Sequence, residues 1–169
     1  MTQSEEIMRI AAKGDGVTAS GRFVSGAAPG DILLADGTLQ QGPHHAAPAC
    51  RHFGKCGGCP LQQLDEETFA TFVAERVANA AEGQGLEPAL IAPTHLSPPR
   101  SRRRAAMRAE SKGGRVEIGF REGRSHKIVD LAECPVLLPA LAGLIAPIRK
   151  LLARQGGRIA ADIELVAVD

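Results

Sequence analysis

The spacing of apolar and glycine residues predicts a front part made of short strands. Across residues 7–41, short apolar pieces are separated by turn sequences such as Gly14-Asp15-Gly16 and Pro29-Gly30-Asp31. Glycine adopts positive φ at tight turns, so this spacing is typical of a small all-β meander or barrel. The low-complexity stretch 40–49, which holds two prolines and two histidines, is interpreted as a linker.

The clearest predicted helix spans residues 65–82. Asp65 suits the N-cap, because a carboxylate accepts hydrogen bonds from the free N–H groups of a first helical turn. Gly83 follows the last apolar position and is a stop signal. The apolar positions recur at helical spacing and are Phe69, Phe72, Val73, Val77 and Ala80.

Two segments with period-two alternation predict a β-hairpin. They span residues 102–110 and 115–121 and are joined by Ser111-Lys112-Gly113-Gly114. Successive side chains of a strand point to opposite faces, so one face is apolar and the other carries arginine. A third strand around 127–131 would complete the sheet. The apolar positions of the hairpin are Ala105, Met107, Ala109, Val116, Ile118 and Phe120.

The remaining pattern predicts a helix over 137–154 and a strand over 159–168. We expect the helix to be interrupted at Pro147, because proline lacks an N–H and its ring crowds the preceding turn. Taken together, the elements predict a mixed α+β fold with two domains. A small β-barrel would span residues 1–45, and an α+β region would span residues 46–169.

The net charge of +1 hides a strong asymmetry along the chain. Residues 1–99 hold 6 basic and 11 acidic side chains, whereas residues 100–127 hold 10 and 3. Such a local excess of arginine is the footprint of a surface that contacts phosphates, although a solvated charged strand is the alternative. The candidate RNA-binding residues are Arg102, Arg103, Arg104, Arg108, Arg115 and Arg121.

The first residues, the apolar stretches and the cysteines indicate the cellular compartment of the protein. The first nine residues do not read as a secretory signal, and the longest apolar stretch, 136–148, is short of the roughly 20 residues that span a bilayer. We therefore expect a cytoplasmic protein with no membrane partner. In that reducing compartment, four cysteines favour metal binding or redox chemistry over disulfides.

The cysteines form the strongest single pattern. Cys50, Cys56 and Cys59 lie within ten residues, and Cys134 follows after 74 intervening residues. Soft thiolates at such short spacing are typical ligands of an iron–sulfur cluster, with one iron for each cysteine in the four-iron form. A structural zinc site is the alternative, since four thiolates also suit tetrahedral zinc. Zinc sites usually use two C-x2-C pairs, however, and only one is present here.

The sequence from Cys50 through Cys56-Gly57-Gly58-Cys59 to Pro60-Leu61-Gln62 resembles the cluster motif of the bacterial RNA uracil-5-methyltransferases, especially the 23S ribosomal RNA branch. Residues 102–107, 118–121, 128–130 and 134–137 resemble further segments of that family. Residues 14–31 resemble its TRAM domain, an OB-like barrel that binds RNA. The resemblance implies a 4Fe-4S cluster with Cys50, Cys56, Cys59 and Cys134 as ligands.

In that family a Rossmann-like domain holds S-adenosylmethionine, a nucleophilic cysteine and a general base. The resemblance implies that this domain would lie beyond Asp169, so we expect the 169 residues alone not to methylate RNA. In the full enzyme, cysteine would attack C6 of an extruded uracil, C5 would take the methyl group, and a base would remove the C5 proton. The helix over 65–82 would pack on that absent domain.

Three functions are therefore compared. The first is the RNA-binding and cluster-binding portion of an S-adenosylmethionine-dependent enzyme that modifies ribosomal RNA. The second is a zinc-stabilised RNA-binding module. The third is an electron-transfer iron–sulfur protein, which the basic segment disfavours because an electron carrier needs no arginine-rich sheet.

Overall fold

The chain forms two compact units, each built from two stretches of sequence. The computed structural model describes residues 3–87, 89–112 and 114–168. The N-terminal unit comprises Met1–Pro48 and Pro60–Leu96, and the cysteine unit comprises Ala49–Cys59 and Ser97–Asp169. The units are thus interleaved along the chain, whereas the sequence suggested a single cut after residue 45.

Five short antiparallel strands form the sheet of the N-terminal unit, as the glycine spacing predicted. They are β1 (Glu5–Ile10), β2 (Gly16–Thr18), β3 (Phe23–Val24), β4 (Ile32–Leu33) and β5 (Leu39–Gln40). The strand order is β3-β2-β1-β4-β5, with β1 at the centre. The register of β1 on β2 shifts between Ile7 and Arg9, which marks an irregularity in the ladder.

A buried carboxylate organises the interior of the N-terminal unit. Asp31 is fully buried, and its oxygens accept hydrogen bonds of 2.7 Å from the N–H groups of Ala28 and Gly42. One oxygen also lies 2.7 Å from Nδ1 of His45, and this contact joins the predicted linker to the start of β4. Gly42 is required here, because a Cβ atom would lie 2.2 Å from the carbonyl oxygen of Gly30.

The helix of the N-terminal unit, α1 (Glu66–Glu82), begins where the sequence predicted. Oδ1 of Asp65 accepts a 2.7 Å hydrogen bond from the N–H of Thr68, and this bond lowers the pKa of the Asp65 carboxyl. None of the residues in α1 is buried. Its apolar residues Phe69, Phe72 and Val73 are only half-buried, so this unit covers the apolar face incompletely.

The cysteine unit contains a four-stranded antiparallel sheet. Its strands are β6 (Arg104–Lys112), β7 (Arg115–Arg121), β8 (Ile128–Asp130) and β9 (Ala160–Val166), in the order β8-β7-β6-β9. The predicted hairpin, third strand and last strand are confirmed; Gly113 of the predicted turn lies outside the described residues. β9 pairs with β6 over its full length, from Arg104 opposite Val166 to Glu110 opposite Ala160.

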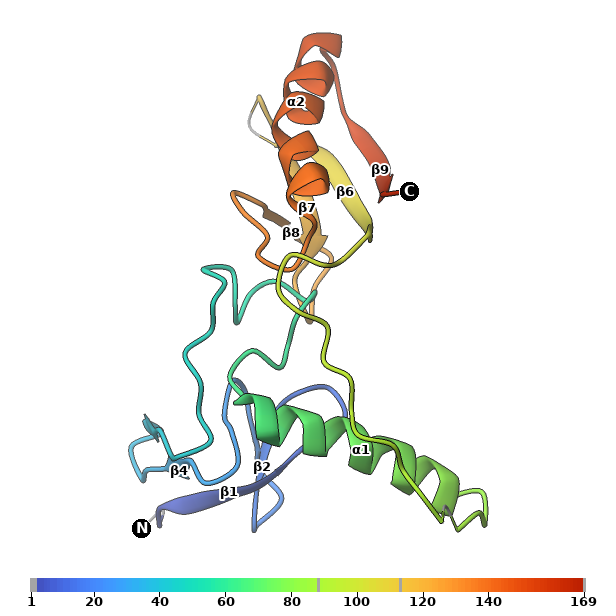
Figure 1. The fold of residues 1–169 in the computed structure, drawn as a ribbon. Coiled ribbons are helices and arrows are strands. Elements are labelled where there is room, and N and C mark those ends of the chain that lie inside the picture. Colours follow the sequence, from blue (N-terminus) through green and yellow to red (C-terminus); the bar gives the residue numbers. More distant parts are fainter. Residues whose placement is uncertain (1–2, 88, 113, 169) are drawn as a thin grey trace. The chain divides into compact units, whose positions relative to one another are not determined.

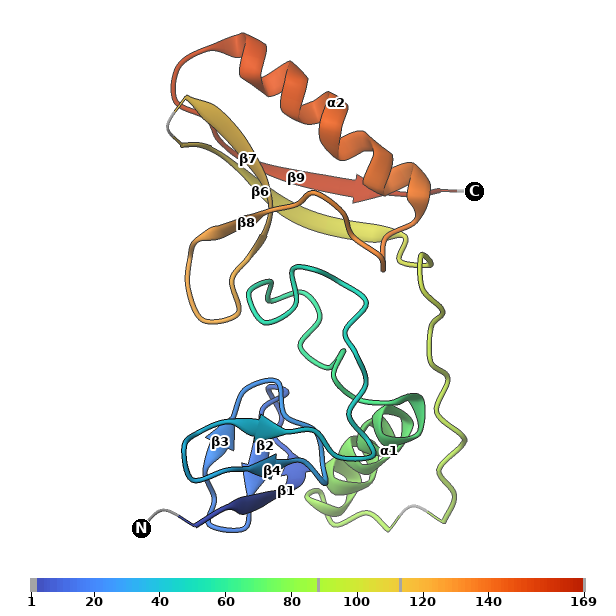
Figure 2. The ribbon, with the colours of Figure 1, turned by 90° about the vertical axis from the view of Figure 1, so that its left-hand side faces the viewer.

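Helix α2 (Pro139–Gln155) lies against the apolar face of this sheet (Figures 1 and 2). The predicted interruption at Pro147 is wrong, because the helix continues through it. Pro147 and Gly143, four residues earlier, are exposed, so water can solvate the carbonyl group that loses its partner. The core residues are Ala105, Met107, Ala109, Val116, Ile118, Leu131, Leu137, Leu141, Ile145, Ile159 and Leu165. Neither of the described helices is long and apolar enough to cross a membrane.

Candidate functional site

All four cysteines belong to the cysteine unit and are half-buried. Three lie on the cysteine loop, which we define as residues Ala49–Cys59, and Cys134 lies between β8 and α2. The sequence separates Cys59 from Cys134 by 74 residues. Two sets of contacts join the cysteine loop to later segments of the cysteine unit.

The first set joins the cysteine loop to the end of β7 and the turn that follows it. The N–H of Gly57 donates a 2.9 Å hydrogen bond to the carbonyl oxygen of Arg121, and the N–H of Gly123 donates one of 3.2 Å to Lys55. Cys56 also pairs with Glu122 in an isolated bridge. A Cβ atom on Gly57 would lie 3.0 Å from the Arg121 oxygen, so this glycine permits a close approach of the two backbones.

The second set joins the cysteine loop to the segment that carries Cys134. Arg51 forms an ion pair with Glu133, with 3.1 Å between Nε and Oε1, and its guanidinium lowers the pKa of the Glu133 carboxyl. The N–H of Ala132 donates a 3.3 Å hydrogen bond to Nε2 of His52. These contacts hold the residues just before Cys134 against the loop that carries the other three thiols.

The thiols are close enough for their charges to interact. Burial raises the pKa of the Cys56 and Cys59 thiols, and negative charge on the other cysteines raises it further. The charge of Arg102 acts in the opposite direction on both. Within residues 3–87, 89–112 and 114–168, no three His, Cys, Asp or Glu side chains converge closely enough to hold a metal ion. The chemistry of the donor set nevertheless fits a group bound through soft thiolates.

The outer face of the sheet is mixed in charge. Arg108 of β6 is half-buried and forms ion pairs of 2.9 Å with Asp162 and 3.2 Å with Glu110. β9 supplies Asp162, and its Glu164 lies opposite Ala106. A count of charge along the chain does not indicate that these acidic side chains of β9 lie beside the arginine-rich strand.

The six candidate arginines occupy three different environments. Arg104, Arg115 and Arg121 are exposed on β6 and β7, and Arg108 is held by carboxylates. Arg102 and Arg103 precede β6; the guanidinium of Arg103 donates a 3.3 Å hydrogen bond to the carbonyl oxygen of Ala167. RNA binding by these arginines stays a prediction.

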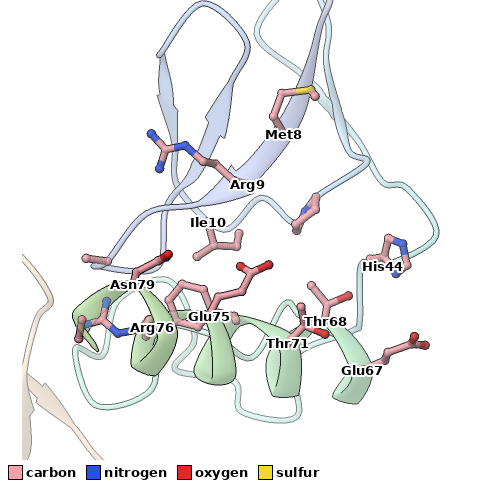
Figure 3. Close-up of a pocket in the computed structure, with 14 residues that line it drawn as sticks. Met8, Arg9, Ile10, His44, Glu67, Thr68, Thr71, Glu75, Arg76 and Asn79 are labelled. Atoms are coloured by element: carbon pink, nitrogen blue, oxygen red, sulfur yellow. The ribbon is translucent and has the colours of Figure 1, made fainter. Parts of the chain in front are cut away.

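A groove of about 740 Å³ lies within the N-terminal unit, between β1 and α1 (Figure 3). Met8, Arg9 and Ile10 line one side, and α1 lines the other with residues that include Phe72 and Arg76. The Arg76 guanidinium carbon lies 5.8 Å from the centre of the Phe72 ring. The groove forms between two elements that are more than 50 residues apart in the sequence, so no local sequence pattern predicts it.

Comparison with known proteins finds relatives over nearly the whole chain. An uncharacterised RNA methyltransferase of Zymomonas mobilis is 42% identical over 166 residues, which is 98% of this chain and 42% of that protein. The 23S rRNA (uracil(1939)-C(5))-methyltransferase RlmD of Halomonas elongata is 35% identical over 166 residues, which is 87% of this chain and 34% of that protein. The chain thus spans about two fifths or less of the length of these relatives.

A solved structure supports the fold. The crystal structure of Pyrococcus abyssi tRNA (uracil-54, C5)-methyltransferase in complex with S-adenosyl-L-homocysteine aligns with a TM-score of 0.63 at 23% identity. The alignment covers 90% of this chain and 37% of that one. No protein-family model matches the chain.

Proposed function

Since this chain belongs to the family of bacterial RNA uracil-C5 methyltransferases, we propose that it forms the RNA-holding and cluster-binding portion of such an enzyme. The proposed substrate is 23S ribosomal RNA, in line with the name of the Halomonas elongata relative. The observation that carries the proposal is the gathering of four cysteines in one unit by a loop and a distant segment.

The proposed cofactor of this portion is a 4Fe-4S cluster held by Cys50, Cys56, Cys59 and Cys134. A single zinc ion needs its thiolates about 2.3 Å away, and hence close to one point. The cysteines contain one C-x2-C pair, whereas zinc sites usually use two such pairs, so their spacing favours a cluster with one iron for each cysteine. The cluster would hold the cysteine loop and the Cys134 segment together, and so couple cofactor binding to folding.

The chain's own residues would bind and orient RNA. The exposed Arg104, Arg115 and Arg121 have forked donors that suit phosphate. Arg108 contributes less in this proposal, because an RNA phosphate would compete with Asp162 and Glu110 for its guanidinium. The five-stranded antiparallel sheet is consistent with a TRAM-like, OB-type barrel, which would be a second RNA-binding surface.

We assign methyl transfer, and the binding of S-adenosylmethionine that supplies the methyl group, to the part of the relatives that this chain does not match. The apolar face of α1, which has no buried residue, is proposed to pack against that part. The 169-residue chain is therefore expected to bind RNA without methylating it.

The test of the cluster is anaerobic purification of the chain followed by iron, sulfide and zinc analysis. We expect about four iron and four sulfide per chain, with a loss of both in Cys56→Ser. His95→Ala is the matched control, since His95 is an exposed residue of the N-terminal unit. One zinc without sulfide would replace this proposal with a zinc-stabilised RNA-binding module.

The test of RNA binding is the salt dependence of affinity for a uridine-containing segment of 23S ribosomal RNA. Each phosphate contact that is lost should reduce the slope of log affinity against log salt by about one. Arg104→Gln and Arg121→Gln should each do so. Arg154→Gln, at the end of α2, removes the same charge outside the sheet and should leave the slope unchanged.

A further inference from the structure

We propose that Gln63 and His45 close the base of the cysteine loop, so that three of the four thiols are held on a closed loop before the proposed cluster binds. Both are positioning residues, because they act on the loop and neither is a proposed ligand. The inference rests on the proposed cluster and assigns it a means of assembly. The residues that form the loop base all belong to the N-terminal unit.

The loop base is a short pair of antiparallel segments, which we call the stem. Residues 44–46 form one segment and residues 63–65 form the other, with a bridge between His45 and Leu64 at the centre. The whole cysteine loop lies between these two segments in the sequence. The stem therefore brings together the chain that leads into the loop and the chain that leaves it.

Backbone hydrogen bonds join the two segments of the stem. The N–H of Ala46 donates a 2.8 Å hydrogen bond to the carbonyl oxygen of Gln63, and the N–H of Asp65 donates one of 3.1 Å to that of His44. The side chains of His44 and Asp65 also meet, with 3.0 Å between Nδ1 and Oδ2. An isolated pair of strands is only marginally stable in water, so the stem needs anchors in the fold.

The first anchor is the buried contact between His45 and Asp31. The His45 side chain is 6% exposed, and its Nδ1 lies 2.7 Å from Oδ2 of Asp31. Oδ1 of the same carboxylate accepts a hydrogen bond from the N–H of Gly42, just before the stem. The segment that leads into the cysteine loop is thus fixed to the start of β4.

The second anchor is the amide of Gln63, which is fully buried. Its Nε2 lies 3.0 Å from the carbonyl oxygen of Gly14 and 3.3 Å from that of Ala27, and donates to both. The turn at Gly14 also packs closely on Pro60, since a Cβ atom on Gly14 would lie 2.9 Å from the Pro60 carbonyl oxygen. The chain is therefore fixed from the residue that directly follows Cys59.

The consequence is that the fold of the N-terminal unit meets part of the entropic cost of ordering the cysteine loop. Bringing the two ends of a loop together costs conformational entropy. A closed stem holds those ends together without iron, so the cluster has to order only the residues between them. With the stem open, the three cysteines of the loop would lie on a longer and freer segment, and iron would be lost faster.

The experiment compares Gln63→Met with the wild type and two controls, all purified anaerobically and analysed for iron and sulfide. Methionine is similar in length to glutamine but cannot donate to the two carbonyl groups. Gln84→Met makes the same substitution at an exposed position just after α1. Leu33→Ala removes a side chain that is 5% exposed, from a residue of β4 that pairs with Leu39 outside the stem. Loss of iron to the chelator ferrozine and urea unfolding are then measured.

We expect iron loss to be about tenfold faster in Gln63→Met than in the wild type, because two buried hydrogen bonds are removed. Gln84→Met should lose iron at the wild-type rate. Leu33→Ala should be at least as sensitive to urea as Gln63→Met and still lose iron at the wild-type rate. That difference separates a positioning role of Gln63 from a general loss of stability.

A second measurement decides if Gln63→Met fails to fold. In Cys56→Ser, which is expected to lack the cluster, hydrogen exchange of the Ala46 and Asp65 amides reports directly on the stem. We expect both amides to exchange slowly, since the anchors of the stem do not depend on iron. Exchange as fast as that of exposed loop amides would overturn the inference.

Equal rates of iron loss in the wild type and in a folded Gln63→Met chain would also overturn it. The same holds if Leu33→Ala loses iron as fast as Gln63→Met, because the effect would then follow from stability alone. A wild-type chain without iron and sulfide would instead refute the proposed cluster itself, and with it this inference.

Discussion

The N-terminal unit and the cysteine unit have different kinds of interior. The buried polar residues that the structure describes, which are Asp15, Thr18, Asp31 and Gln63, all lie in the N-terminal unit. The cysteine unit instead buries a continuous apolar cluster between its sheet and α2. The strands of the N-terminal sheet are two to six residues long and bury little apolar surface, so side-chain hydrogen bonds to the backbone hold its loops.

The two helices show the same contrast. Both contain 17 residues, yet α2 buries Leu141 and Ile145 whereas α1 buries none. Amphipathic spacing therefore predicts that a helix forms, but the amount of surface it buries depends on the partner that the fold provides. In the cysteine unit that partner is the apolar face of the sheet.

The largest effect is expected from damage to the apolar interior of the cysteine unit. Ile118 is fully buried at the centre of the sheet, so Ile118→Ala should lower the free energy of unfolding by about 3–4 kcal/mol. Leu151→Ala is the control, because Leu151 is 61% exposed on α2, and it should change stability by less than about 0.5 kcal/mol. Urea unfolding measures the stability of both variants. Equal losses of stability would show that the apolar interior does not stabilise this unit.

An intermediate effect is expected from the buried carboxylate of the N-terminal unit. Asp31→Asn replaces an oxygen that accepts hydrogen bonds with an amide that donates, and so leaves the N–H of Ala28 or Gly42 without its partner. The expected loss is about 2 kcal/mol. Hydrogen exchange should also quicken at those two amides.

The control for that variant is Asp36→Asn. The Asp36 side chain accepts a hydrogen bond from the N–H of Thr38 in an exposed turn, so water can replace the lost contact. Its effect should be far smaller than that of Asp31→Asn. Similar losses in the two variants would contradict the organising role of Asp31.

The smallest effect is expected from a half-buried surface carboxylate of the same unit, Glu5. Hydrogen bonds from Ser20, Thr18 and Arg22 lower the pKa of Glu5 from 4.5 to about 2. A lowered pKa stabilises the fold above pH 4.5, and this contribution is lost as the pH falls toward 2. Glu5→Gln should therefore be less stable than the wild type at neutral pH, by an amount that solvent screening keeps small.

A pH series of urea unfolding checks this expectation. The difference between the wild type and Glu5→Gln should disappear as the pH approaches 2. A difference that stays constant across the series would show that the charge of Glu5 contributes nothing to stability.

The sequence by itself determined the elements that depend on local signals. The helix after Asp65, the hairpin with its buried Ala105, Met107 and Ile118, and the family were all predicted correctly. Periodicity, capping and turn chemistry act over a few residues, so they can be read without knowledge of the fold. Three of the four cysteines lie close together in the sequence, so the motif by itself indicates that these three share one loop.

Only the tertiary structure decided which distant residues meet. It placed Asp162 of β9 beside Arg108, His45 beside Asp31, and Arg102 beside the segment that follows Cys134. It also kept α2 continuous through Pro147. These outcomes depend on strand order and register, and on which helix face meets solvent, because long-range pairing is selected by the burial of the whole chain and leaves no local pattern.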